Sequence, residues 1–203
     1  MNEAAAFLPF ARTKSGHVRA SLIAGAGALI ILISLASALL PLASGLSNAS
    51  VIGTMMVAAG IMEVLAANLR ANNRIAAALP GLVTIAAGAL FAVEPFGAFV
   101  PTVRLVIGWL AVRGLLLALT SLDVGGSVRV WTILAAATDL SLSAILYIGL
   151  TASTITILFF GPTAEIVGSF AWVVALSFVA TGMLLLEVAA CEAAARTNAP
   201  APD

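Results

Sequence analysis

Three charged residues lie inside stretches of the sequence that are otherwise apolar. Glu63, Arg113 and Asp139 each fall near the middle of a run long enough to cross a bilayer. A charge at that depth costs about 2.5–3.5 kcal/mol on insertion scales, so it should have a partner. One cation and two acids at similar depth predict an ion pair. We expect Arg113 to pair with Asp139, with Glu63 as its second partner.

Three interpretations of this charge cluster (Glu63, Arg113 and Asp139) remain open. In the first, the ion pair is structural and fixes the register of the helices. In the second, two carboxylates that share one arginine form a titratable site in a polar cavity, which senses or carries protons. In the third, one of the three residues faces a partner protein or lipid headgroups.

A second charged pair is expected at the outer membrane face. Glu94 and Arg104 flank a short turn that contains Pro95, Gly97 and Pro101. Exposed ion pairs contribute roughly 0–1 kcal/mol to stability. We therefore interpret this outer-face pair as part of the hairpin geometry rather than as a functional site.

The sequence lacks the usual patterns of catalytic and metal sites. Its single histidine, His17, lies in a polar leading segment, and its single cysteine, Cys191, cannot form an intramolecular disulfide. Protein zinc sites normally need several His or Cys ligands, and no glycine-rich phosphate loop follows a predicted strand. We expect no enzymatic activity, no cofactor and no metal. The net charge of zero also argues against a nucleic-acid partner.

The composition is that of a polytopic membrane protein. Of the 203 residues, 62% are hydrophobic and 9% are charged, and the mean hydropathy is +1.16. Soluble domains are about 45–50% apolar and about 25% charged. So few charges could not cover the surface of a soluble domain. The predicted fold class is therefore an all-α integral membrane protein with the lipid bilayer as its main partner.

Six transmembrane helices are predicted from the apolar runs, since a span needs about 20 such residues. They cover approximately 20–40, 51–69, 75–93, 100–122, 128–150 and 166–190. A cytoplasmic segment (1–19) precedes the transmembrane domain (20–190), and a cytoplasmic tail (191–203) follows it. Residues 151–165 form a longer, still apolar connection between the last two spans.

The basic residues predict the orientation of the chain. Seven basic residues lie on one side of the predicted topology, namely Arg12, Lys14, Arg19, Arg70, Arg74, Arg129 and Arg196. The three opposite loops contain none, although Arg104 lies just inside the outer end of the fourth span. Basic residues near span ends stay cytoplasmic. Both termini are therefore expected in the cytoplasm of a bacterial cell, with the protein in its inner membrane. An even number of spans is required for this arrangement.

The sequence contains an internal repeat with a displacement of 54 residues. It places Gly27 on Gly81, Ile31 on Ile85, Pro41 on Pro95 and Gly60 on Gly114. A third, weaker copy covers the last two spans, where the connection is longer. Because each copy begins and ends on the same side, we expect three parallel helical hairpins over 20–69, 75–122 and 128–190.

Small residues recur at heptad spacing on several spans. In lipid, such residues let helix backbones approach each other closely. We expect five glycines to serve as helix-packing residues rather than to line a narrow path: Gly53, Gly60, Gly81, Gly88 and Gly114.

The hairpin pattern resembles a known family. The string GLVTIAAGALFAVEP (81–95), a short turn, and IGWLAVRGLLLAL (107–119) resemble the repeated hairpin of HdeD-type acid-resistance membrane proteins. The strings at 27–41 and 52–67 fit the same pattern, whereas the last two spans fit it loosely. The resemblance implies a six-span bacterial inner-membrane protein that is linked to acid or general stress and has no catalytic residues.

The sequence thus supports three hypotheses about function. The first is a non-enzymatic stress-resistance protein of the HdeD type. The second is a small transporter or channel that uses the charge cluster. The third is an accessory subunit of a larger membrane complex, or a homo-oligomer. A continuous polar path through the bundle would favour transport, and an open face of small residues would favour a subunit.

Overall fold

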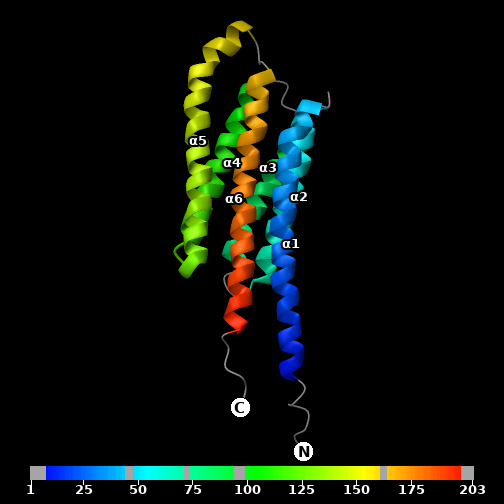
Figure 1. Cartoon of the computed structure of the whole chain (residues 1–203). Coiled ribbons are helices and arrows are strands. Elements are labelled where there is room, and N and C mark those ends of the chain that lie inside the picture. The colour runs from blue at the N-terminus through cyan, green and yellow to red at the C-terminus, as the bar shows by residue number, and fades with distance from the viewer. Residues whose placement is uncertain (1–7, 44–47, 71–73, 94–98, 161–163, 198–203) are drawn as a thin grey trace, which may run out of the picture.

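The computed structural model describes residues 8–43, 48–70, 74–93, 99–160 and 164–197. Over these residues the chain forms six helices and no strand (Figure 1). The helices are α1 (Leu8–Ala43), α2 (Asn48–Leu69), α3 (Arg74–Val93), α4 (Phe99–Thr120), α5 (Gly126–Phe160) and α6 (Ala164–Thr197). All six are long and apolar enough to cross a membrane. The predicted all-α, six-span membrane fold is confirmed.

The helices differ in how far they extend beyond the predicted spans. α2, α3 and α4 contain 20–22 residues, which matches a hydrocarbon core of about 30 Å. α1, α5 and α6 contain 36, 35 and 34 residues and are too long for that core alone. The leading segment is helical from Leu8, and α6 continues to Thr197. The predicted connection 151–165 is helical except at 161–163, for which no structure is described. Hydropathy finds only the part of a helix that lipid surrounds, whereas backbone hydrogen bonds can continue into water.

The two ends of the bundle carry different connections. α1 begins and α6 ends at the same end, which also carries the α2–α3 and α4–α5 connections (Figure 1). We call this the terminal end and the other the opposite end. The α4–α5 turn at the terminal end includes Gly126, whose φ of 63° is a left-handed conformation that glycine adopts readily. Arg70 and Arg129 lie at this end, which the sequence predicts to be cytoplasmic.

The six helices form a closed ring. Each packs against its neighbours in sequence, and α1 packs against α6. The most extensive contacts join α2 to α3, α1 to α6 and α4 to α5. The two helices of each predicted hairpin pack against each other less extensively. The closest helix pairs are therefore those between hairpins, not those within them.

Glycines explain why the junctions between hairpins are so close. A Cβ atom added to Gly60 would lie 2.8 Å from the carbonyl oxygen of Gly81, and one added to Gly88 would lie 2.8 Å from that of Gly53. At the α6–α1 junction, a Cβ atom on Gly182 would lie 2.8 Å from the carbonyl oxygen of Gly27. These helices touch backbone to backbone, a contact that small residues permit in lipid.

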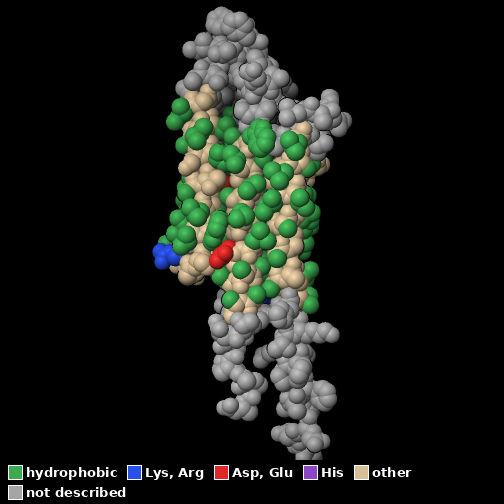
Figure 2. Space-filling view, in the orientation of Figure 1, with side chains coloured by type: hydrophobic (Ala, Val, Ile, Leu, Met, Phe, Trp, Pro, Cys, Tyr) green, Lys and Arg blue, Asp and Glu red, His purple; other side chains and the backbone are tan. Residues whose placement is uncertain are grey.

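The outer surface of the bundle is apolar over its middle. Figure 2 shows hydrophobic side chains covering the central part of one face. Exposed residues of this kind come from every helix, among them Leu32, Leu82, Leu115, Ile148 and Leu176. A water-soluble protein rarely exposes so large an apolar area. The surface matches contact with lipid hydrocarbon.

The predicted orientation can be tested by cysteine labelling in intact cells. The native Cys191 is first replaced by serine, and single cysteines are then placed at Ala152 and Gly125. We expect a membrane-impermeant maleimide to label Ala152→Cys from outside. Gly125→Cys should react only after the cells are permeabilised. Labelling of Gly125→Cys in intact cells would reverse the orientation. Ser47, Asn72 and Gly97, which lie outside the described residues, offer further positions for the same test.

Candidate functional site

Arg113 lies in the second half of α4 and is buried inside the bundle. It is the largest fully buried side chain in the described part of the chain, with 0% of its surface exposed. The next residue, Gly114, faces α5, where an added Cβ atom would lie 3.1 Å from the Cβ of Asp139. The missing side chain at Gly114 therefore brings Asp139 close to the arginine.

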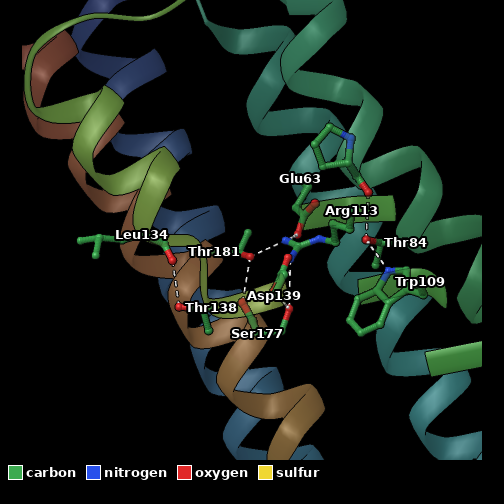
Figure 3. Close-up of polar contacts among 10 residues, drawn as sticks. Glu63, Thr84, Trp109, Arg113, Leu134, Thr138, Asp139, Ser177 and Thr181 are labelled. Carbon is green, nitrogen blue, oxygen red and sulfur yellow. Dashed lines mark hydrogen bonds and ion pairs between the residues drawn. The ribbon is translucent and has the colours of Figure 1, made fainter. Parts of the chain in front are cut away.

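The guanidinium of Arg113 binds both carboxylates of the charge cluster (Figure 3). Its Nη1 lies 2.5 Å from Oδ2 of Asp139, and its Nη2 lies 2.7 Å from Oε1 of Glu63. A Cβ atom added to Gly81 of α3 would lie 2.9 Å from the Cβ of Glu63. Each acid is thus set beside the arginine by a close helix junction at a glycine.

Two hydroxyl groups of α6 complete the network. Nη1 of Arg113 also donates to Oγ of Ser177 at 3.0 Å, and Nη2 donates to Oγ1 of Thr181. Ser177 in turn donates to Oδ1 of Asp139 at 2.5 Å. The sequence analysis missed both residues. Their spacing of four residues, which puts polar side chains on one face of an apolar helix, was the available signal.

Two aromatic rings lie against the guanidinium. The Cζ atom of Arg113 is 5.8 Å from the ring centre of Trp109 and 5.9 Å from that of Phe178. At such distances a cation is attracted to the ring face. The indole nitrogen of Trp109 donates to Thr84 at 3.2 Å, and Thr84 donates to the carbonyl oxygen of Pro80 at 2.9 Å. These contacts connect α3 and α4 beside the cluster.

The charges of the cluster do not balance. With both acids ionised, one arginine and two carboxylates carry a net charge of −1. Both oxygens of Asp139 accept hydrogen bonds, but Oε2 of Glu63 makes none with the residues that the structure describes. An uncompensated charge inside the membrane is costly. One bound proton or one monovalent cation would neutralise the site.

The internal repeat shows which residues occupy the positions equivalent to Asp139. The 54-residue displacement that relates Ile31 to Ile85 also relates Ile85 to Asp139. Ile31 lies against Gly182, Ile85 against Gly60, and Asp139 against Gly114. All three residues lie against a glycine of a neighbouring helix, but Ile31 and Ile85 are apolar, whereas Asp139 is an acid. Close packing therefore does not require this carboxylate.

A cavity connects the cluster to the terminal end. Its volume is about 290 Å³, and its walls come from α2 to α6 and the α4–α5 turn. Glu63, Arg113 and Thr181 line its deep part, and Arg70 and Asp123 line it near the terminal end. Asp139 does not line it and has no exposed surface. Of the two carboxylates, the one that faces the cavity is Glu63, which keeps 6% of its surface exposed.

The half of the bundle toward the opposite end is closed by apolar side chains. Val103, Val106 and Leu110 of α4 are buried there, together with Phe91 of α3. The cavity does not continue through this layer, since none of these residues lines it. Among the residues that the structure describes, the polar path is thus one-sided and ends at the charge cluster.

The structure gives no contact between Glu94 and Arg104. Glu94 lies outside the described residues, and the side chain of Arg104 is exposed. The outer-face pair therefore remains a prediction.

Comparisons with known proteins give no match to this chain. No protein-family model matches it. No curated protein and no solved structure matches it either. The resemblance to HdeD-type proteins therefore rests on the quoted sequence patterns.

Proposed function

We propose that this chain is a non-enzymatic membrane protein that binds a proton at its charge cluster and serves in acid or general stress resistance. One observation carries the proposal: a buried cluster with one excess negative charge is reached through a cavity from the terminal end. The resemblance to HdeD-type proteins supports the link to acid stress.

Glu63 is the residue that takes up the proton. Its Oε2 is the carboxylate oxygen of the cluster without a hydrogen bond to the described residues, and its side chain lines the cavity. The charged groups that act on it are Arg113 of α4, Asp139 of α5 and Arg70, the residue that follows its own helix. α3 presents Gly81, and α6 presents the hydroxyl of Thr181. A proton on Glu63 leaves Arg113 and Asp139 as a neutral pair.

The fluorescence of Trp109 should report this protonation. Trp131→Phe and Trp172→Phe leave Trp109 as the remaining tryptophan, with its ring 5.8 Å from the Cζ of Arg113. We expect its emission to shift with pH as the charge next to the guanidinium changes. The shift should disappear in Glu63→Gln, which cannot lose a proton. It should persist in Glu187→Gln, a control acid on α6 outside the cavity lining.

The same two variants test the biological role. In an acid-sensitive bacterial host, the native chain and Glu187→Gln should raise survival after acid exposure. Glu63→Gln should give the survival of cells that carry no copy, although it reaches the membrane in equal amount. Equal protection by Glu63→Gln and the native chain would remove Glu63 from the function.

A small transporter is the second candidate, and the one-sided cavity favours it. Transporters place substrate and coupling-ion sites near the middle of the bilayer at the interface of repeats, and open them to one side at a time. The charge cluster lies at junctions between the predicted hairpins, with its cavity toward the terminal end. Within the described part of the chain, the continuous polar path that would favour a channel is missing, because apolar side chains close the other half.

A further inference from the structure

We infer that the cavity between the charge cluster and the terminal end is a binding site for a small organic cation with an apolar body. The bound cation exchanges with the proton on Glu63. This inference rests on the proposed proton site and adds a ligand to it. It follows from three properties of the cavity: the charge at its deep end, the hydrogen-bond acceptors that line it, and its volume.

The charge at the deep end of the cavity favours a cation over an anion. Both terminal nitrogens of Arg113 are engaged by the two acids and the two hydroxyls, and its Nε, which has no hydrogen-bond partner among the described residues, has almost no accessible surface. The guanidinium therefore presents no accessible donor to an anion in the cavity. Oε2 of Glu63 remains as an acceptor, and the cluster carries one excess negative charge.

The hydroxyl groups that line the cavity also favour a cationic ligand, because they offer hydrogen-bond acceptors and no free donors. Thr120 donates its proton to the carbonyl oxygen of Leu117 at 2.9 Å, and Thr132 donates to that of Val128 at 2.7 Å. Thr181 donates to the carbonyl oxygen of Ser177 at 3.0 Å. A hydroxyl group has one proton and two lone pairs, so each of these three retains acceptor capacity and no free donor. Such a lining suits a ligand that brings donors or positive charge.

Arg70 does not reverse this preference. It directly follows α2, about two helical turns from Glu63, and lies nearer the terminal end of the cavity. The negative charges of Glu192 and Glu63 act on it. Asp123 lines the same part of the cavity and adds a negative charge there. A cation that enters therefore passes one arginine and one aspartate, whose formal charges cancel, before it reaches the acids at the deep end.

The size and the walls of the cavity limit the ligand. Ligand pockets are commonly about 300–1,000 Å³, so a volume of about 290 Å³ admits only a small molecule. Leu117, Leu184, Leu185 and Val188 form apolar walls. A monovalent ammonium group with one small hydrocarbon substituent fits this cavity, because the ammonium group matches the acidic deep end and the hydrocarbon matches the apolar walls. In the exchange, protonated Glu63 releases its proton to water and the ligand supplies the replacing positive charge, so the charge of the site is unchanged.

Calorimetry on the full chain in detergent tests this exchange. Benzylammonium is the probe, and benzenesulfonate is a probe of similar shape and opposite charge. We expect saturable one-to-one binding of benzylammonium and none of benzenesulfonate. At a pH where the Trp109 response shows Glu63 protonated, titration in two buffers of different ionisation enthalpy should show about one proton released per cation bound. Glu63→Gln should abolish both, and Glu187→Gln should retain both. Ala77→Phe, which fills part of the cavity without changing a charge, should also abolish binding.

Each other outcome has a distinct meaning. If benzylammonium fails to bind while the pH response of Trp109 is intact, the cation site is wrong and the proposed proton site stands. If it binds at that pH without proton release, the exchange is wrong, while the pH response of Trp109 still supports the proton site. Binding that survives in Glu63→Gln and in Ala77→Phe places the cation elsewhere and overturns the assignment.

Discussion

Replacing Arg113 with leucine is expected to cause the largest loss of stability of any single core substitution. It leaves Glu63 and Asp139 as two like charges in the membrane interior without a cation. Breaking a buried ion pair typically costs about 3–5 kcal/mol, and here two pairs are lost at once. We expect Arg113→Leu to give little folded protein. The measurement is the free energy of unfolding in mixed micelles, with the yield of monodisperse protein as a second measure.

The number of unpaired charges that each variant leaves predicts how much stability it loses. Asp139→Leu leaves Arg113 paired with Glu63, and Glu63→Gln leaves it paired with Asp139, so each keeps a balanced pair. Both should lose less stability than Arg113→Leu. Replacing all three residues with leucine should recover most of the loss, because well-packed apolar residues often replace buried ion pairs at little cost. Simple addition of the single losses would show that the three side chains are not coupled.

Adding one methyl group at Gly60 is expected to cause the second large loss. The new Cβ atom would lie 2.8 Å from the carbonyl oxygen of Gly81 and 2.9 Å from the backbone nitrogen of Ile85. Backbone atoms cannot move aside without separating α2 from α3. Overpacking of this kind costs about 1–3 kcal/mol. We expect Gly60→Ala to lower the melting temperature in detergent clearly.

Alanine substitutions at two further glycines should lower the stability less than Gly60→Ala does. A Cβ atom at Gly114 would first meet the side-chain atom Cγ of Leu140 at 2.9 Å, and the nearest backbone atom, the carbonyl oxygen of Ala136, at 3.2 Å. Gly114→Ala should therefore cost less than Gly60→Ala. Gly108 has nothing within 4 Å, so Gly108→Ala should be neutral or stabilising by about 0.5–1 kcal/mol through helix propensity. Equal melting of all three variants would contradict the close α2–α3 junction.

The sequence alone determines the class of the protein and the members of its charge cluster. Six apolar runs of bilayer length predict six spanning helices, because hydropathy and span length are local properties of the chain. Glu63, Arg113 and Asp139 stand out for the same reason, since a charge inside an apolar run is costly wherever the run packs. The small residues at heptad spacing also indicate where helices can approach each other.

Only the tertiary structure decides how these elements meet. A soluble helix shows its buried side by an apolar stripe, but a helix in lipid is apolar on all sides. The sequence therefore does not fix the rotation of α4, which turns Arg113 toward both acids and toward Ser177 and Thr181. For the same reason it does not reveal that the closest junctions lie between hairpins. The cavity that reaches Glu63 from one end arises from side chains of five helices, whose spacing is set by packing and not by any local pattern.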